Sequence, residues 1–296
     1  MIDIRQSEPA RLRLPSWLKK PLAHAGRYNE VNVLLSAASL HTVCREAKCP
    51  NRSECFSSGT ATFLVMGSLC TRSCRFCGVV HGVPEILDKD EPRRVCEAAM
   101  AMGITHAVIT SVTRDDLLDG GASHFAEIIR LFRQRLPHVA VEVLVPDFRG
   151  SGQALQAVLA AGPHVFNHNI ETVPRLYSAI RPQALYRRSL EMLANAAQFG
   201  VELRIKSGLM VGLGETPDEV LETLRDMHDS GCRLVTIGQY LQPSREQVPV
   251  AEYVTPERFD RYRTQALAMG FASVQSGPFV RSSYRAETMM TTQPLS

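Results

Sequence analysis

Three cysteines crowd into one short stretch of this 296-residue chain: Cys70, Cys74 and Cys77, with the spacing C-x3-C-x2-C. Thiolates packed this closely on one loop suit a [4Fe–4S] cluster, because each of them can bind one iron corner of the cube. The loop has no fourth cysteine, so one iron would keep an open coordination position. An open position on a metal implies a ligand that a substrate or a cofactor brings.

A zinc site is the alternative for this loop. Zinc commonly uses two C-x-x-C pairs or a mixture of cysteine and histidine, and it usually needs four ligands. Ser73 and His81 lie near the cysteines, but neither completes a familiar zinc spacing. The spacing therefore favours the iron–sulfur cluster.

A second group of three cysteines lies just upstream, with the spacing C-x4-C-x5-C: Cys44, Cys49 and Cys55. Six of the eight cysteines of the chain thus fall into two sets of three. The other two, Cys96 and Cys232, stand alone in apolar segments. Because a buried free cysteine behaves as a small hydrophobe, both are expected in the core.

The Cys70 loop resembles that of the radical S-adenosylmethionine (SAM) superfamily. In that superfamily the amino and carboxylate groups of SAM chelate the open iron. An electron from the cluster then cleaves SAM to a 5′-deoxyadenosyl radical. Phe76, just before the third cysteine, resembles the aromatic residue that packs near the adenine of SAM.

Longer motifs give a more specific resemblance. The upstream cysteines are followed by Gly-Thr-Ala-Thr-Phe at 59–63, and Gly-Pro-Phe-Val-Arg-Ser-Ser-Tyr stands at 277–284. Over residues 21–286 the chain resembles the lipoyl synthase family. It departs at Leu69, where that family often has threonine, and at Phe56, where tryptophan is usual. Neither residue is a proposed ligand.

The composition, 45% hydrophobic and 21% charged, fits one large globular domain. A net charge of +3 gives no indication of nucleic-acid or membrane binding. No run of about 18 apolar residues predicts a membrane span, and the first residues lack the pattern of a signal peptide. Eight cysteines in such a chain indicate the reducing cytoplasm and metal binding rather than disulfides.

Residues 1–28 carry prolines and arginines and show weak periodicity. They predict a solvated arm, with a surface that meets an acidic protein partner as the alternative. A short helix is expected over 28–40.

From residue 62 onward, apolar runs typical of strands alternate with runs of helical period. The predicted strands are 62–66, 106–110, 139–145, 165–170, 203–210 and 234–240. The predicted helices are 91–102, 124–136, 152–161, 188–199, 217–230 and 256–269.

Six such units predict an α/β fold with a parallel sheet covered by helices. A doubly wound sheet would produce the same pattern, whereas the resemblance implies a partial (β/α)6 barrel of radical SAM type. The barrel is expected over 59–270, with an N-terminal extension, 1–58, that carries the upstream cysteines. A C-terminal segment, 271–296, is expected to return to the core with its Arg-Ser-Ser-Tyr motif.

Polar residues cluster where the predicted strands end, which is where barrel enzymes place their chemistry. Arg181 suits the carboxylate of SAM, because guanidinium makes paired charge-assisted hydrogen bonds. Glu171 or Asn169 suits the ribose hydroxyls, and Lys206 and Gln239 are further candidates for cofactor binding. For Lys206 or Glu171, a structural ion pair across the barrel is an equal alternative. The stretch 113–121 resembles the superfamily's glycine-rich element, which contacts the SAM amino group.

The family resemblance implies that Cys44, Cys49 and Cys55 hold an auxiliary [4Fe–4S] cluster that serves as sulfur donor. It also implies that a serine of the Arg-Ser-Ser-Tyr motif is the fourth ligand. We assign Ser283, with Ser282 as the fallback. An ordinary polar turn is the alternative explanation of this motif.

Together these resemblances imply sulfur insertion at C6 and C8 of an octanoyl chain linked to a lysine. The implied partners are lipoyl-carrier proteins, such as glycine cleavage H protein or dihydrolipoyl acyltransferase subunits, and an electron donor such as flavodoxin or ferredoxin. The chain is expected to act as a monomer. The nearest alternative is a biotin-synthase-like sulfur-inserting enzyme, followed by a two-cluster electron carrier and a zinc-stabilised binding protein.

Overall fold

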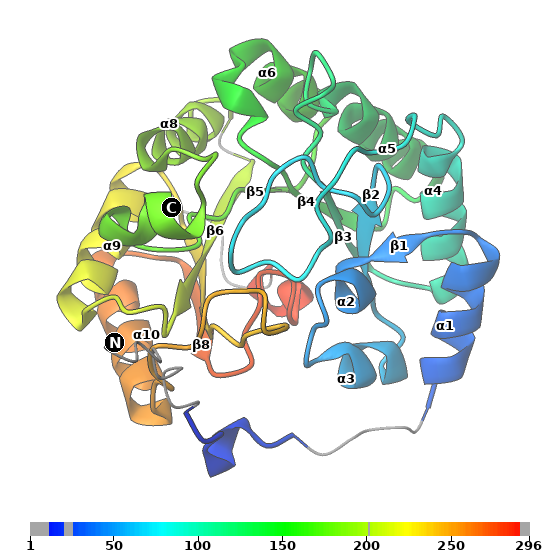
Figure 1. Cartoon of the computed structure of the whole chain (residues 1–296). Helices are drawn as coiled ribbons and strands as arrows, with labels where there is room; N and C mark the ends of the chain where they lie inside the picture. The colour runs from blue at the N-terminus through cyan, green and yellow to red at the C-terminus, as the bar shows by residue number, and fades with distance from the viewer. Residues whose placement is uncertain (1–11, 21–25, 201, 291–296) are drawn as a thin grey trace, which may run out of the picture.

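The computed structural model describes residues 12–20, 26–200 and 202–290. Its centre is an eight-stranded sheet with strands in the order β1 to β8, curved into an incomplete barrel (Figure 1). β1 is antiparallel to β2, and every later pair of neighbours is parallel. The strands are β1 His41–Thr42, β2 Thr62–Val65, β3 His106–Ser111, β4 Ala140–Leu144, β5 Val165–Asn167, β6 Arg204–Val211, β7 Leu234–Gln239 and β8 Ser273–Gly277.

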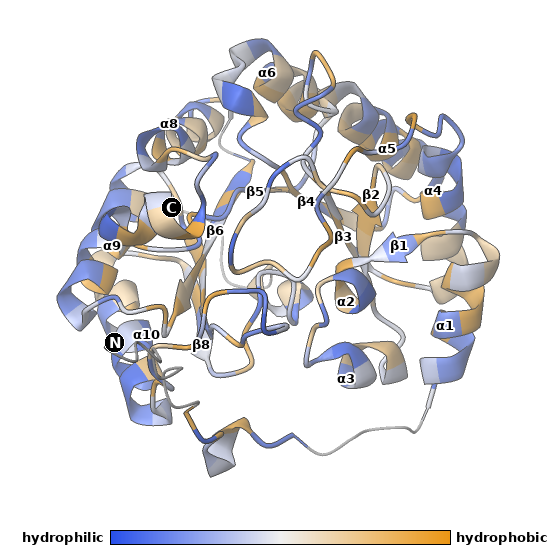
Figure 2. Cartoon of the chain, viewed as in Figure 1, coloured by the Kyte–Doolittle hydropathy of each residue, from blue (hydrophilic) through white to orange (hydrophobic). Residues whose placement is uncertain are grey.

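Six longer helices surround the barrel, and Figure 2 shows that their polar sides face outward. They are α4 Glu91–Met102, α5 Ala122–Arg135, α6 Gly152–Ala160, α8 Tyr186–Ala197, α9 Pro217–Asp229 and α10 Pro256–Met269. Helix α1 (Tyr28–Ala37) and the short α2 (Val43–Glu46) and α3 (Arg52–Ser57) precede the barrel. In the described part of the chain, no helix combines the length and apolar character needed to cross a bilayer.

The partial (β/α)6 barrel predicted from the sequence is confirmed. The strands follow one another around the sheet in chain order, which excludes the doubly wound alternative, because that fold reverses its strand order at a switch point. The sequence missed β8, a seventh parallel strand paired with β7. Its residues, Ser-Val-Gln-Ser-Gly, lack the apolar run by which the other strands were recognised.

Local sequence signals explain where the helices begin and end. Thr216 caps α9, accepting the N–H of Glu219, while the Glu219 side chain accepts the N–H of Thr216. Gly103 and Gly270 end α4 and α10 in the left-handed conformation, with φ of 65° and 104°. Glycine adopts this conformation without the strain that a Cβ would introduce.

Both ends of the described chain make contacts with the rest of the molecule. After β8 the chain reaches the short helix η4 (Ala286–Met289), where Met289 packs with Val165 and Leu234 at the first residues of β5 and β7. In the N-terminal arm, Leu18 is buried and Lys20 hydrogen bonds to Asn51. The prediction of a solvated arm is therefore wrong for these two residues. Residues 1–11 and 21–25 lie outside the described residues.

A buried ion pair crosses the inside of the barrel between β4 and β6, the two strands that flank β5. The Lys206 ammonium on β6 lies 2.8 Å from a carboxylate oxygen of Glu142 on β4, and both side chains are 1% exposed. Asn167 and His106 also hydrogen bond to this carboxylate. Burial alone would raise the pKa of Glu142, but the Lys206 and His106 contacts hold it at about 2.

Replacing Lys206 by methionine should lower the free energy of unfolding by about 3–5 kcal/mol, because it leaves the Glu142 carboxylate buried without its cation. The double variant Glu142→Leu/Lys206→Met removes both charges and should recover part of the loss. In the wild type, the contribution of Glu142 should be complete above pH 4.5 and lost as the pH falls toward 2. Urea unfolding at several pH values measures all three effects, and unchanged stability of Lys206→Met would contradict them.

Candidate cluster and cofactor sites

The Cys70 loop lies at the carboxyl end of β2, and in Figure 1 it crosses the middle of the view, over the barrel. The N–H of Cys70 donates to the carbonyl of Val80 (2.9 Å), which ties the two sides of the loop together. The Cys70 sulfur accepts backbone N–H groups from Arg72 (3.4 Å) and Thr113 (3.3 Å). These two contacts fix the position of the Cys70 sulfur between its own loop and the segment after β3.

The three thiols of this loop lie close enough to influence one another. Burial, together with the neighbouring Cys74 and Cys70 thiolates, raises the pKa of Cys77 to about 12. Burial also raises the pKa of Cys74, whereas the nearby Arg181 cation opposes that rise. A buried group of thiols that disfavour one another's charge fits a polynuclear iron site, because the metal supplies the missing positive charge.

Arg72 fastens this loop to the barrel. Its guanidinium donates twice to Asp115, at 2.7 and 2.9 Å, and once to Asp147, at 2.6 Å. Asp115 follows β3 and Asp147 follows β4, so one side chain joins the loop to two strand ends. Burial alone would raise the pKa of Asp147, but Arg72 holds it at about 2.

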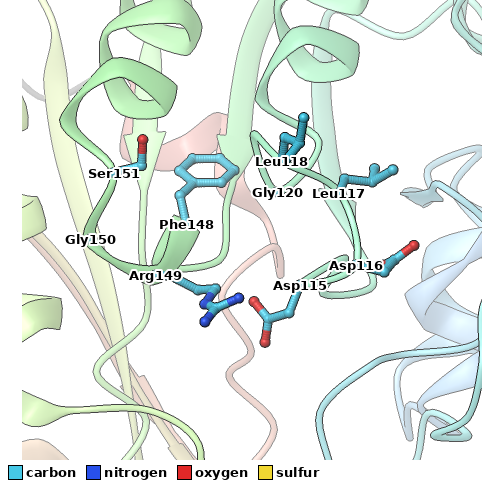
Figure 3. Close-up of a pocket in the computed structure, with 9 residues that line it drawn as sticks. All are labelled: Asp115, Asp116, Leu117, Leu118, Gly120, Phe148, Arg149, Gly150 and Ser151. Atoms are coloured by element: carbon cyan, nitrogen blue, oxygen red, sulfur yellow. The ribbon is translucent and has the colours of Figure 1, made fainter.

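A cavity of about 370 Å³ opens beside this anchor, between the loops that follow β3 and β4 (Figure 3). In Figure 3 the side chains of Asp115 and Arg149 point toward each other at its edge. Phe148 and Arg149 both have positive φ, 42° and 53°, a strained conformation for residues other than glycine. Because Asp115 binds Arg72 and also lines the cavity, the cavity is coupled to the position of the Cys70 loop.

A polar wall faces Cys74 from β5 and the segment after it. Asn169 donates to Glu171 (3.0 Å), and Arg181 donates to the carbonyls of Asn169 and Ile170. Burial raises the pKa of Glu171, whose φ of 71° is unusual for a residue with a side chain. Within the described residues, the buried Asn169 Oδ1 and Arg181 Nε atoms have no hydrogen-bond partner. Unpaired buried polar atoms of both kinds, an acceptor and a donor, fit a polar ligand such as SAM.

Three further residues were predicted from the sequence to bind the cofactor, and they lie in different surroundings from one another. Phe76 packs with Ile180, Leu213 and Tyr240 beside the Cys70 loop. Lys206 is the buried partner of Glu142. The Gln239 amide donates to backbone carbonyls and accepts the N–H of Val254. The structure therefore gathers Phe76, Asn169, Glu171 and Arg181 near the loop, and it engages Lys206 and Gln239 in contacts within the protein.

The upstream cysteines come from α2, the loop after it and α3. Burial, together with the neighbouring thiolates of the same group, raises the pKa of Cys44 to about 11 and that of Cys55 to about 12. Cys44 also hydrogen bonds to the backbone and the side chain of Thr62, the first residue of β2. Cys44 and Cys55 thus repeat the electrostatic character of Cys74 and Cys77 in the other group.

The C-terminal motif places one serine at each site. The Thr62 hydroxyl, which also contacts Cys44, donates to Ser283 Oγ at 2.7 Å. Ser282 Oγ instead accepts from Asn169 at 2.6 Å, on the polar wall. Of the two serines, Ser283 therefore lies beside the residue that contacts Cys44, whereas Ser282 lies on the polar wall.

The two cysteine groups are neighbours in space. A Cβ added to Gly78, the residue after Cys77, would lie 3.1 Å from the carbonyl oxygen of Ala47, between Cys44 and Cys49 in the sequence. This contact is too close for a side chain to fit without a shift of the backbone. The glycine thus lets the two loops touch.

In the described part of the chain, no three His, Cys, Asp or Glu side chains are close enough to share a single metal ion. A [4Fe–4S] cube binds each thiolate at a different iron, so its ligands need not share one. All eight cysteines are free. The sequence carries no signal for Thr62, because its role depends on a contact with a distant part of the chain. The same holds for the contact of Arg72 with Asp147, although the position of Arg72 between Cys70 and Cys74 could have drawn attention to it.

A family model described as the radical SAM superfamily matches residues 64–227, from β2 into α9. The fold, the Cys70 loop and this match together define a protein of the radical SAM superfamily. A second model, the N-terminal domain of lipoyl synthase, matches residues 2–49. Lipoyl synthase of Rubrobacter xylanophilus is 52% identical, covering 95% of this chain and 88% of that protein. Lipoyl synthase of Chlorobaculum parvum is 54% identical, covering 95% and 97%. The chain belongs to the lipoyl synthase family.

Solved structures agree on the fold. Methylornithine synthase has a TM-score of 0.54 at 15% identity, covering 88% of this chain and 86% of that one. HydG, a maturase of the [FeFe]-hydrogenase, has a TM-score of 0.54 at 16% identity, covering 72% and 55%. Membership of the family confirms a radical SAM sulfurtransferase that uses SAM and two [4Fe–4S] clusters. It acts on lipoyl-carrier proteins, and the biotin-synthase-like alternative is not favoured.

Replacing Arg72 by methionine should lower the free energy of unfolding by about 3 kcal/mol or more, because the buried Asp147 carboxylate loses its main cation. It should also reduce the iron bound at the Cys70 loop. Arg93→Met removes an exposed ion pair with Glu97 and should cost less than about 1 kcal/mol. Urea unfolding and iron analysis of both variants measure the difference, and equal losses would contradict the anchoring role.

Proposed function

We propose that Cys70, Cys74 and Cys77 hold the cluster that cleaves SAM, and that Cys44, Cys49 and Cys55 hold the sulfur-donating cluster with Ser283 as its fourth ligand. When bound, the first group supplies the electron for SAM cleavage and the second supplies sulfur. The observation that carries this assignment is the contact of Thr62 with both Cys44 and Ser283. It joins residues from the two ends of the chain into one donor set.

The chain's own residues would bind and orient the cofactor and the acyl chain. Arg181, with its free Nε, suits the SAM carboxylate, and Glu171 or Asn169 suits the ribose hydroxyls. Phe76 and its apolar neighbours would exclude water around the adenine. Lys206 and Gln239 would act by supporting this wall, since the protein already satisfies their polar atoms.

The reaction we propose is insertion of two sulfur atoms, at C6 and C8 of an octanoyl-lysine on a carrier protein. Glycine cleavage H protein or a dihydrolipoyl acyltransferase subunit would present this lysine. Flavodoxin or ferredoxin would supply electrons, and the chain would work as a cytoplasmic monomer without nucleic acid or membrane. The barrel would comprise residues 59–270, and the sulfur-donating site beside it would be completed by residues 1–58 and 271–296. Free cysteines throughout the chain support a reducing compartment.

An anaerobic assay with an octanoyl-lysyl peptide, SAM and a reductant tests the reaction itself. Protein with both sites filled should contain about eight irons per chain, from two four-iron cubes. The product should gain two sulfur atoms, measured by mass spectrometry. A product without added sulfur, or zinc in place of iron, would refute the proposal.

Ser283→Cys should keep about eight irons per chain but block sulfur insertion, because a thiolate is a softer ligand and holds iron more firmly than serine oxygen does. Ser230→Cys, at the C-terminal end of α9, is the matched control and should leave both properties unchanged. Iron analysis and product mass are the measurements. Full sulfur insertion by Ser283→Cys would remove Ser283 from the ligand set.

The two cysteine groups should separate by function. Cys49→Ala should still cleave SAM but should form no lipoyl group, whereas Cys74→Ala should do neither, because the radical is made at the Cys70 loop. Chromatography of 5′-deoxyadenosine and mass analysis of the peptide report the two steps. Loss of SAM cleavage in both variants to the same extent would contradict separate roles.

A further inference from the structure

Three separate segments meet beside the upstream cysteines. Lys20, from the N-terminal arm, donates to Asn51 Oδ1 at 2.8 Å and forms an ion pair with Glu54 on α3. The same ammonium lies 5.0 Å from the ring centre of Phe279 and 5.5 Å from that of Tyr284, both in the C-terminal segment. Cations at this distance over aromatic rings are attracted by the ring electrons.

Further hydrogen bonds join α3 and the residues before it to the C-terminal segment. The Tyr284 hydroxyl donates to Glu54 Oε1 at 2.8 Å. The Asn51 side chain donates to the carbonyl of Phe279 at 2.7 Å. The Lys20 and Glu54 side chains are 24% and 31% exposed, so water only partly screens their attraction. We call Lys20, Asn51, Glu54 and Tyr284 the clasp.

Two members of the clasp are sequence neighbours of proposed iron ligands. Glu54 directly precedes Cys55, and Tyr284 directly follows Ser283. The hydrogen bond between Glu54 and Tyr284 therefore limits how far the two ligands can separate, and it does so without any metal. On the other side of Ser283, the Thr62 hydroxyl restrains the serine oxygen itself.

We propose that the clasp positions Ser283 against the upstream cysteines, so that the serine is in place before iron binds. Glu54 and Tyr284 act as positioning residues in this assembly, and Lys20 and Asn51 hold them. The inference rests on the proposed role of Ser283. A serine oxygen is an unusual ligand for iron in a cluster, so holding it in place adds more to its binding than it would for a thiolate.

The test compares four variants after anaerobic reconstitution with ⁵⁷Fe: Tyr284→Phe, Glu54→Gln, Ser283→Ala and Tyr186→Phe. Tyr186 donates to Asp226 at 2.7 Å between α8 and α9, so its variant loses the same kind of bond away from both cysteine groups. Mössbauer spectra report the serine-bound iron, and a chelator titration reports how firmly it is held. Thermal unfolding shows whether each variant is folded.

Tyr284→Phe and Glu54→Gln should each lose the serine-bound iron to chelator about tenfold more readily than the wild type, the factor expected for loss of one hydrogen bond to a charged group. Tyr186→Phe should match the wild type in chelator sensitivity, even if its melting temperature falls by a similar amount.

Three results would decide against parts of this account. If Tyr284→Phe and Tyr186→Phe have equal chelator sensitivity, the clasp has no positioning role. If Ser283→Ala leaves the spectrum unchanged, Ser283 is not a ligand and the proposed function fails at that point. If Ser283→Ala changes the spectrum but neither clasp variant does, only the clasp is refuted.

Discussion

The contact between the C-terminal segment and the residues around the upstream cysteines is the constraint on which the two sites depend. Thr62 begins the first parallel strand, and its hydroxyl reaches Ser283, more than 200 positions later in the chain. Ser282, the adjacent residue, faces Asn169 on the opposite side. Two consecutive serines thus face in different directions, and the segment that carries them lies between the polar wall around Asn169 and the upstream cysteines.

Buried polar groups in the barrel are of two kinds. Those that stabilise the fold are paired with each other, and those at the candidate ligand site keep atoms without a partner in the described chain. Lys206 with Glu142, and Arg72 with Asp147, are buried and paired at hydrogen-bond distance, as buried charges must be. Asn169 and Arg181 lie in an equally buried wall, yet each keeps an atom without a partner in the described chain. Such atoms cost free energy unless something binds them. The unpaired atoms therefore mark where a polar cofactor is expected.

The sequence predicted most of this fold because the strands are buried on both faces and therefore form nearly continuous apolar runs. β8 escaped notice because its side chains are mostly polar and only partly buried. At the site, the cysteine spacings indicate two groups of three thiols, and the assignment of each group to a cluster stays a prediction. Lys206 shows what spacing cannot decide: a cation in a barrel strand can meet a ligand or a carboxylate of another strand, and only the packed barrel distinguishes the two. The contact of Lys20 with Glu54 has no local signal either, because its two partners lie far apart in the sequence.

β8 and the Arg-Ser-Ser-Tyr motif return to the part of the chain that carries the upstream cysteines. This return also determines when Ser283 and the upstream cysteines can come together. A ribosome releases the upstream cysteines well before Ser283 and Tyr284, which follow Thr62 by more than 200 positions. Contacts between residues so far apart in sequence form late in folding, because the loop between them must close first. The nascent protein thus carries the three upstream thiols without Ser283 beside them until the C-terminal segment has been made and has folded back.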